Sequence, residues 1–350
     1  MLTESELRLL HDGAFIPAHP LALTKEKQLD EQHQRALTRY YIDAGVDGVA
    51  VGVHTTQFEI RDPNINLYEK VLQIAMEEIN KQASDRPFLK VAGICGSTAQ
   101  AVGEARLAKK LGYNLGLLSF GGLEEFTEDK LLVHTKEVAK VIPIFGFYLQ
   151  PAVGGRELSY QFWKEFAEIE NVHAIKIAPF DRYKTLDVVR AVCHSSRNKE
   201  IALYTGNDDN IVIDLLTNYE IRVSDQVIKK KIVGGLLGHW AVWTKNAVTM
   251  FQQIKQVREN RMDISAYLPL ANEVTDTNAA FFDTANNFKG CITGINEILA
   301  RQGLLKGNWC LLDTERLSPG QLDEIDRVYR EYPHLNDDQF VKDNLQKWLK

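Results

Sequence analysis

The sequence predicts an α/β protein, a (β/α)8 TIM barrel with a C-terminal helical extension, and three observations support this fold class. Short apolar runs with strand character alternate with amphipathic helical stretches from about residue 13 to about residue 258. Eight such runs occur, which favours a closed barrel over an open sheet. After Arg258 the strand signals stop and only helical segments follow. We therefore expect a barrel over residues 1–258 and a helical extension over residues 259–350 that packs on the barrel.

The spacing of apolar residues predicts the individual elements. Strands are expected at residues 14–19, 48–53, 88–94, 114–119, 142–149, 172–177, 201–205 and 232–236. Helices are expected at residues 29–44, 67–82, 98–111 and 127–141, and in the extension at 276–302, 319–332 and 337–349. The chain starts with a short helix in which Thr3 and Glu6 have the spacing of a capping box. Residues 218–231 are longer than a barrel connection needs, so we predict an excursion there.

Length, charge and cysteine content exclude several classes of protein. With 350 residues and 45% hydrophobic content, the chain can bury one large core. The 41 basic and 47 acidic residues are mixed along the chain, so we expect no binding to nucleic acid, and the run 229–231 of three lysines is interpreted as surface. The polar start lacks the apolar segment of a signal peptide, and no stretch approaches the ~20 apolar residues of a membrane span. The four cysteines are scattered, which predicts thiols in a reducing cytoplasm.

Lys176 is the residue from which the chemistry is predicted. In a (β/α)8 barrel the reacting groups come from the C-terminal ends of the strands. Alternation along the strand at 172–177 places Lys176 on one face with Val172 and Ala174. If that face is the barrel lumen, desolvation lowers the pKa of the amine, and the neutral amine can attack a ketone carbon. The alternative is that Lys176 ends a strand and extends into solvent, because lysine is rarely buried.

Tyr148 is predicted to relay protons for this amine. It lies at the end of the preceding strand, 28 residues before Lys176, which corresponds to one βα unit. We therefore expect both side chains to reach one cavity, where the phenol acts as general acid and base. Alternatively, Tyr148 is a core aromatic whose hydroxyl bonds to a neighbour.

Three further positions are predicted to bind substrate. Thr55 and Thr56 follow the strand at 48–53 and can donate hydroxyl and backbone hydrogen bonds to a carboxylate, although a simple threonine turn is the alternative. Gly206 begins the sequence Gly-Asn-Asp-Asp at the end of the strand at 201–205 and offers a backbone that a ligand can approach closely. The two acidic residues after it suit a helix N-terminus.

A divalent metal site is the alternative built on His19, His54 and Glu59. The two histidines follow the first and second strands and can converge on one centre. Neither a His-x-His pair nor a matching carboxylate on a later strand completes the set. We therefore predict no metal and no other cofactor.

These motifs resemble the dihydrodipicolinate synthase and N-acetylneuraminate lyase family of Schiff-base (β/α)8 enzymes, over nearly the whole chain. The sequence Gly-Val-Asp-Gly-Val at 45–49, followed by Thr55-Thr56, is similar to the family's GvdGi…GTTGE segment, whose threonines bind the carboxylate of a 2-oxo acid. Tyr148-Leu149-Gln150-Pro151 falls where the family has YNxP with its catalytic tyrosine, and Lys176 falls where it has the imine-forming lysine. The sequence at 206–209 resembles the family's GDD element.

Three departures from the family pattern bear on the substrate. His54 and Gln57 stand where the family has glycines on either side of the threonine pair. The family's fourth-strand tyrosine, often presented to a neighbouring subunit, is replaced by the sequence Ser-Phe-Gly-Gly at 119–122. Residues 152–155, which precede Arg156, are more similar to the sugar-acid lyases than to the dihydrodipicolinate synthase branch.

The leading hypothesis is a cytoplasmic lyase of the class I aldolase type. It cleaves or forms a carbon–carbon bond next to pyruvate or a related 2-oxo acid, with Lys176 as nucleophile and Tyr148 as proton relay. The resemblance implies a homo-oligomer, a dimer or a tetramer. Two alternatives stay open: a metal-dependent barrel hydrolase or aldolase, and a family relative that has lost the chemistry and binds a small acid.

Overall fold

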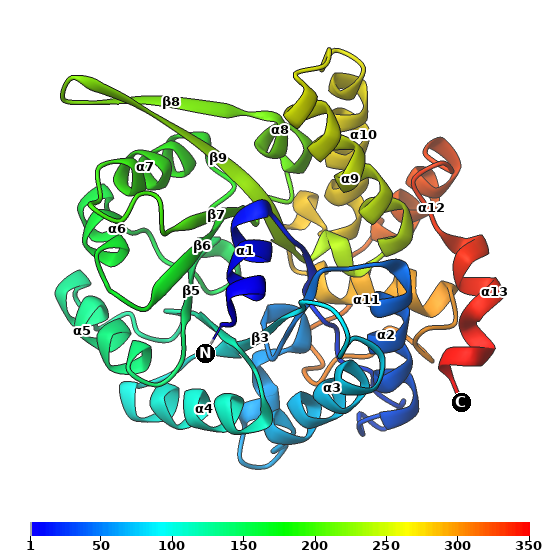
Figure 1. Ribbon diagram of the computed structural model, residues 1–350. Helices are drawn as coiled ribbons and strands as arrows, with labels where there is room; N and C mark the ends of the chain where they lie inside the picture. The colour runs from blue at the N-terminus through cyan, green and yellow to red at the C-terminus, as the bar shows by residue number, and fades with distance from the viewer. Residues whose placement is uncertain (1) are drawn as a thin grey trace. The chain divides into compact units, whose positions relative to one another are not determined.

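The computed structural model describes residues 2–350 and confirms the predicted (β/α)8 fold class (Figure 1). Eight βα units follow one another along these residues, and all eight predicted strands are present. The strands are β1 (Phe15–Pro17), β2 (Gly48–Val51), β3 (Leu89–Ile94), β4 (Leu115–Leu118), β5 (Ile144–Leu149), β6 (Val172–Ala178), β7 (Ala202–Thr205) and β9 (Gln226–Leu237). The helices that follow them are α2 (Glu31–Ala44), α3 (Tyr68–Gln82), α4 (Thr98–Leu111), α5 (Glu128–Ala139), α6 (Tyr160–Ala167), α7 (Arg182–Cys193), α8 (Ile211–Leu216) and α9 (Thr244–Asn260).

Internal contacts divide the chain into two compact units. The first contains the chain up to Ala14 together with Leu89–Leu236, and the second contains Phe15–Phe88 and Leu237–Lys350. The predicted extension at 259–350 therefore lies in the same unit as β1 and β2. Among residues 2–350, no helix combines the length and the apolar composition that are needed to cross a membrane.

The first unit is built on a parallel sheet with the strand order β3-β4-β5-β6-β7-β9. Its strands are runs of buried apolar residues, as expected for a parallel sheet that is covered on both faces. In the register, Phe147 of β5 lies beside Lys176 of β6, which lies beside Tyr204 of β7. A register shift separates Ile144 from Phe145 in β5. Up to this shift, paired residues of β5 and β6 are 28 positions apart in the sequence, and after it they are 29 positions apart.

The predicted excursion is an antiparallel ribbon. β8 (Asn218–Val223) pairs with the first half of β9, and the two strands are joined by a turn at Ser224 and Asp225 (Figure 1). The interpretation of all three lysines at 229–231 as surface is wrong for Lys230. Its Nζ donates hydrogen bonds to the backbone carbonyls of Asn198 and Ile201, and burial lowers its pKa to about 8.

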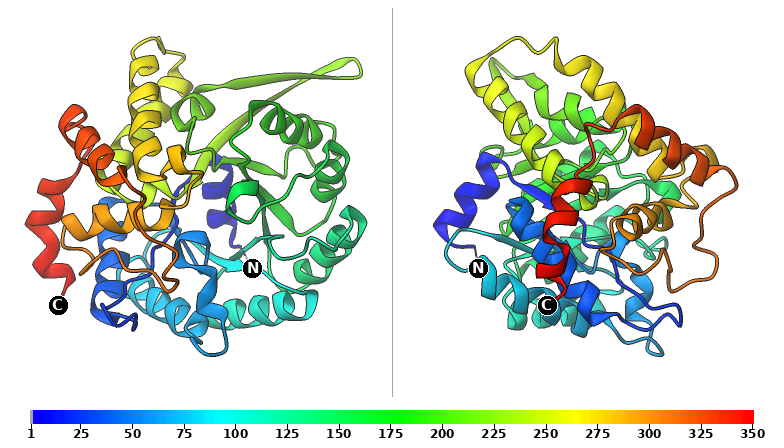
Figure 2. Two further views of the ribbon diagram at one scale, coloured as in Figure 1. Left: turned by 180° about the vertical axis from the view of Figure 1, so that it is seen from behind. Right: turned by 90° about the vertical axis from the view of Figure 1, so that its right-hand side faces the viewer.

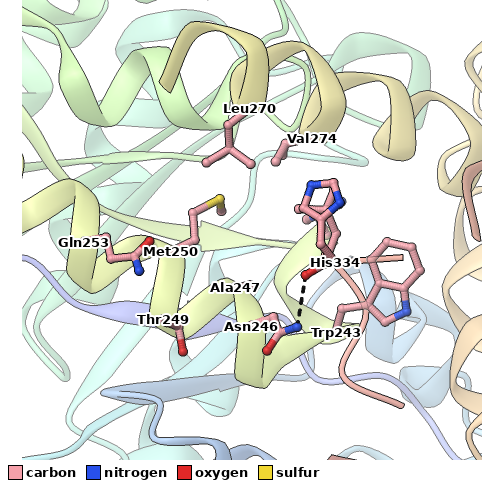
Figure 3. A pocket seen from close by; sticks show the side chains of 11 residues that line it. Trp243, Asn246, Ala247, Thr249, Met250, Gln253, Leu270, Val274 and His334 are labelled. Atoms are coloured by element: carbon pink, nitrogen blue, oxygen red, sulfur yellow. Dashed lines mark hydrogen bonds between the residues drawn. The ribbon is translucent and has the colours of Figure 1, made fainter. Parts of the chain in front are cut away.

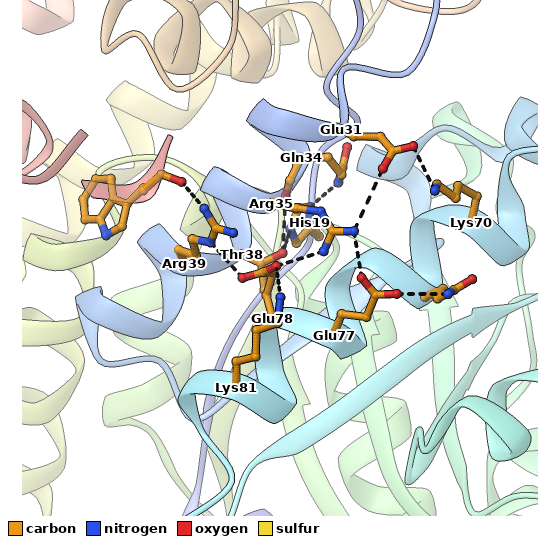
Figure 4. Close-up of polar contacts among 12 residues, drawn as sticks. His19, Glu31, Gln34, Arg35, Thr38, Arg39, Lys70, Glu77, Glu78 and Lys81 are labelled. Carbon is orange, nitrogen blue, oxygen red and sulfur yellow. Dashed lines mark hydrogen bonds and ion pairs between the residues drawn. The ribbon is translucent and has the colours of Figure 1, made fainter. Parts of the chain in front are cut away.

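In the second unit, two half-buried arginines of α2 form ion pairs with a buried glutamate of α3 (Figure 4). Arg35 and Arg39 donate hydrogen bonds to the Glu78 carboxylate at 2.9 and 2.7 Å. Burial alone would raise the pKa of Glu78, but these hydrogen bonds and the two positive charges outweigh it and lower the pKa to about 2. The charged form of Glu78 is therefore part of the contact between the two helices.

The C-terminal segment forms four helices, α10 (Tyr267–Phe281), α11 (Cys291–Arg301), α12 (Gln321–Glu331) and α13 (Asp338–Trp348). The prediction of one continuous helix at 276–302 is wrong. Asp283, Asn287 and Phe288 adopt positive φ, a conformation that Asp and Asn tolerate better than most residues. The Asp283 carboxylate accepts a hydrogen bond from the Gly290 backbone N–H and so stabilises the break.

The last helix, α13, packs on α2 within the second unit (Figure 2). Trp348 is buried, its indole N–H donates to Asp43 at 2.7 Å, and its carbonyl accepts from Arg39 at 2.6 Å. These contacts attach the end of the chain to the first βα unit.

Candidate functional site

Lys176 lies near the C-terminal end of β6 and is almost completely buried, with 7% of its surface exposed. Its Nζ is 4.3 Å from the centroid of the Phe147 ring, a distance at which the π face attracts an ammonium group. On the other side, Tyr204 stands next to it in the register. The structure thus rejects the interpretation of Lys176 as a lysine that ends a strand in solvent.

Tyr204 of β7 is held in place by hydrogen bonds to the first helix, α1 (Glu4–Asp12), and to the residue that precedes β1. Its hydroxyl donates to the Leu10 carbonyl at 2.8 Å and accepts from the Ala14 N–H at 3.1 Å. α1 has the predicted capping box between Thr3 and Glu6. Because its hydroxyl both donates and accepts a hydrogen bond, Tyr204 is a rigid neighbour for Lys176.

Gly206, a predicted substrate contact, makes room for Lys176. A Cβ atom at position 206 would lie 2.4 Å from the Cε of Lys176 and 2.7 Å from the Cβ of Ala178. The close approach that the glycine was expected to allow is therefore made by the lysine side chain itself.

A buried carboxylate organises the loop that follows β7. Asp214 of α8 is fully buried and accepts hydrogen bonds from the Thr205 hydroxyl at 2.7 Å and from the Asn207 amide at 3.0 Å. Arg182 of α7 donates to the same carboxylate. The Asn207 Oδ1 in turn accepts from the Phe180 N–H at 3.0 Å, which ties the loop after β7 to the loop after β6.

We did not predict this network from the sequence, although the sequence contains a signal for it. Asp214 is the only charged residue in the run Ile-Val-Ile-Asp-Leu-Leu at 211–216, and a carboxylate in an apolar run must find partners. Asp209, predicted as a helix cap, is half-buried in the same loop, and burial raises its pKa.

Tyr148 is not brought to the face that carries Lys176. In the register Tyr148 pairs with Ile177, so alternation directs it to the opposite face of the sheet. Its ring packs on Trp163 of α6 at a centroid distance of 5.2 Å. Its hydroxyl accepts from the Leu158 N–H at 3.3 Å and lies 3.5 Å from the Leu158 carbonyl, while burial raises its pKa. The expectation that both side chains share one cavity assumed a constant offset, and the shift after Ile144 removes it.

Thr55 and Thr56 lie in a short 3-10 turn, His54–Thr56, in the second unit, and both are buried. The Thr56 hydroxyl donates to the His19 carbonyl at 2.7 Å and accepts from the N–H groups of Gly52 and Val53. It is therefore fully used by the turn. The Thr55 hydroxyl makes only a long contact, 3.4 Å, to the same carbonyl.

Gln57, which follows the threonines, has a positive φ of 68° and is 1% exposed. Its Oε1 accepts from the Leu311 N–H at 2.7 Å, so the side chain holds the loop between α11 and α12. The glutamine that departs from the family pattern is thus a tether within the second unit.

His19, one of the two histidines of the metal hypothesis, has partners within the protein. His19 is fully buried, with Nδ1 at 2.8 Å from the Pro20 carbonyl and Nε2 at 2.9 Å from the Thr38 hydroxyl. Among residues 2–350, no group of three or more His, Cys, Asp or Glu side chains has a geometry suited to a metal ion. His19 therefore stabilises the loop after β1.

A pocket of about 350 Å³ opens elsewhere in the second unit, between α9, α10 and the loop before α13 (Figure 3). Met250, Leu270 and Val274 give it an apolar lining. Asn246 closes one side by donating a hydrogen bond to the His334 carbonyl at 3.2 Å. None of the predicted site residues lines this pocket.

Comparison with known proteins gives consistent matches. A model of the dihydrodipicolinate synthetase family matches residues 14–219. The chain is 22% identical to N-acetylneuraminate lyase 2 of Escherichia coli over 320 residues, which cover 89% of this chain and 92% of that protein. It is 25% identical to 4-hydroxy-tetrahydrodipicolinate synthase of Dechloromonas aromatica over 204 residues, which cover 57% of this chain and 65% of that protein.

Solved structures show the same fold. YagE from Escherichia coli, a prophage protein of the dihydrodipicolinic acid synthase family in complex with pyruvate, has a TM-score of 0.73 at 16% identity, covering 92% of this chain and 98% of its own. CdNal from Clostridium difficile in complex with mannosamine has a TM-score of 0.71 at 17% identity, covering 91% and 99%.

Proposed function

Because the chain belongs to the dihydrodipicolinate synthetase family, we propose that it is a lyase of the class I aldolase type, in which Lys176 forms an imine with pyruvate or a related 2-oxo acid. The observation that carries the proposal is a buried amine near the C-terminal end of a barrel strand, beside the loop after β7. Pyruvate is also the ligand named for YagE and for the N-acetylneuraminate lyase of Fusobacterium nucleatum, two proteins of the same fold.

The chemistry requires few groups. In the cleavage direction, the neutral Nζ attacks C2 of a 4-hydroxy-2-oxo acid, and uptake of one proton with loss of one water leaves a protonated imine. The protonated imine accepts the electron pair of the C3–C4 bond as that bond breaks, while the C4 hydroxyl gives its proton to a base or to water, which releases an aldehyde and leaves an enamine on Lys176. Protonation of the enamine and hydrolysis then return pyruvate and the free amine. The condensation reaction follows the same steps in reverse.

The remaining site residues are assigned with the geometry in view. We propose that the turn at Thr55 and Thr56 binds the carboxylate through the Thr55 hydroxyl, because the hydroxyl and the N–H of Thr56 are already used within the turn. Gly206 acts by admitting the Lys176 side chain. A relay role for Tyr148 stays a prediction, and it requires the hydroxyl to leave Leu158.

Borohydride trapping tests the proposal. Incubation with pyruvate and borohydride should add the mass of the reduced adduct to the peptide that contains Lys176. The Lys176→Ala variant should not be labelled, while Lys199→Ala, which removes an exposed lysine, should be labelled like the unmodified protein. If no 2-oxo acid in a broad set gives an adduct at Lys176, the imine mechanism is wrong.

The second candidate is a protein that binds a small acid without turnover. The engaged hydroxyls of Tyr148 and Thr56 favour it, because both are the groups expected to move protons or hold the carboxylate. In that case pyruvate would raise the thermal midpoint of unfolding without leaving an adduct after borohydride.

A further inference from the structure

We propose that the free edge of β8 pairs with the same strand of a second copy of this chain, to form a two-fold symmetric dimer. Within residues 2–350, β8 hydrogen-bonds to β9 alone, along an uninterrupted register from Asn218 with Lys231 to Val223 with Gln226. An edge strand without a partner offers a row of backbone donors and acceptors to another chain. β8 has neither a proline nor a bulge to prevent this.

The turn determines which backbone groups face the free edge. In an antiparallel hairpin closed by two residues, the pair next to the turn is hydrogen-bonded, and hydrogen-bonded pairs then alternate with non-bonded ones. Val223, Ile221 and Tyr219 therefore direct their N–H and C=O groups to β9. Glu220 and Arg222 direct theirs to the free edge.

The sequence of β8 is complementary to itself in one antiparallel register. When Ile221 lies opposite Ile221 of a second copy, Glu220 of each chain lies opposite Arg222 of the other. Glu220 and Arg222 are the residues whose backbone groups are available, so the hydrogen-bonding pattern and the charge pattern select the same register. Opposite charges in directly opposed cross-strand positions are stabilising.

On β8, the face opposite Glu220 and Arg222 is apolar. In this register Ile221 lies opposite its own copy and Tyr219 lies opposite Val223, so these side chains share one face; β9 adds Ile228 to this face, between Gln226 and Lys230. All four are only partly buried in the single chain. A ribbon of two strands is marginally stable in water, and a four-stranded sheet with one apolar face is more stable.

The surroundings of the ribbon point to a covered surface. α7 contacts β8, and it exposes Tyr183 at 83% and Leu186 at 40%. Val227, on β9 opposite Arg222, is 44% exposed. Val227 therefore lies on the same face as Glu220 and Arg222. Exposed large apolar side chains near a free strand edge are typical of protein–protein interfaces. The base of the ribbon is fixed by the hydrogen bonds of Lys230 to the backbone, so the strand is presented in a defined direction.

Charge reversal tests this interface in the full-length protein. Arg222→Glu places like charges opposite each other at both ends of the register, and Glu220→Arg does the same with the other sign. We expect each variant to raise the dissociation constant about tenfold or more, measured by sedimentation velocity over a range of protein concentrations. An equimolar mixture of the two variants should recover association, because each Glu then faces an Arg.

Two controls separate the interface from folding and from activity. Lys110→Glu, an exposed charge reversal on α4, should associate like the unmodified protein. Thermal unfolding should show that both β8 variants are folded, and the mass measurement does not depend on whether Lys176 forms an imine. The proposal is overturned if the unmodified protein is a single chain at tens of micromolar, if the variants associate as it does, if their mixture does not recover, or if assembly continues beyond a closed particle.

Discussion

The Lys176 side chain lies directly against Gly206, so closely that a Cβ atom on residue 206 would stand 2.4 Å from the lysine Cε. Only a residue without a side chain permits this position of the amine. β6 and β7 are neighbours in the sheet, so the conformation of the lysine depends on the loop that follows the next strand.

Replacing this glycine should displace the amine. We expect Gly206→Ala to lower pyruvate–borohydride labelling of Lys176 by roughly tenfold to a hundredfold, because a displacement of about 1 Å is enough to disturb a reacting group. The overpacking should lower the free energy of unfolding by about 1–3 kcal/mol. Labelling rate and urea unfolding measure the two effects. Gly103→Ala is the control, since a Cβ there meets nothing within 4 Å and the site lies in a helix, so labelling should persist. Unchanged labelling in Gly206→Ala would contradict the assignment.

Tyr148→Phe distinguishes a structural phenol from a proton relay. Because the hydroxyl bonds to the Leu158 backbone on the face opposite Lys176, we expect labelling by pyruvate to stay within about threefold. The free energy of unfolding should fall by about 1 kcal/mol, the contribution of one hydrogen bond. A loss of labelling of a hundredfold or more, with stability unchanged, would support the relay role instead.

The alternation of elements predicted the fold because each βα unit leaves its own local pattern. Seven of the eight strands and the helices of the first units lie within a few residues of their predicted positions, and the eighth, β9, begins six residues early because its first half belongs to the ribbon. The excursion at 218–231 was also visible as alternation. The helix break at Asp283 was missed because three non-glycine residues adopt positive φ, a choice that depends on the bond from Gly290 and other contacts made after folding.

The site was predicted less completely, because the register between strands cannot be read from residue types. Lys176 was recognised because a lysine in an apolar strand is unusual whatever its neighbours are. The face to which Tyr148 points depends on the register shift after Ile144. A shift of one residue moves a side chain to the opposite face of the sheet, but residue types alone do not reveal it. The Asp214 network depends on which loops meet, which is likewise decided by tertiary structure.

Asp214→Asn should weaken the loop after β7. The carboxylate accepts from Thr205, Asn207 and Arg182, and an amide nitrogen in place of one oxygen would face these donors with a donor of its own. We expect a loss of about 2–3 kcal/mol in the free energy of unfolding, from urea titration. Asp187→Asn, which removes an exposed carboxylate 3.5 Å from Arg190, should change it by less than about 0.5 kcal/mol. Equal effects of the two variants would show that the Asp214 network does not stabilise the loop.

His19 should make the protein less stable in mild acid. Burial lowers its pKa to about 4 in the folded protein, against an ordinary value of 6.5, and the bond with the Pro20 carbonyl opposes this only in part. The unfolded chain therefore binds a proton that the folded chain does not, so this contribution is complete above pH 6.5 and is lost as the pH falls from 6.5 toward 4. Between pH 7 and pH 5 the loss is about 2 kcal/mol.

Urea titration at both pH values measures this slope. His19→Gln should be less stable at pH 7, because it loses the bond to Thr38, but its dependence on pH should be flatter by that amount. His334→Gln, which changes an exposed ring, should keep the slope of the unmodified protein. The difference in slope would then identify the neutral His19 imidazole as the titrating group. The backbone carbonyl of His19 accepts a hydrogen bond from the Thr56 hydroxyl. A His19→Gln variant as sensitive to acid as the unmodified protein would place the titrating group elsewhere.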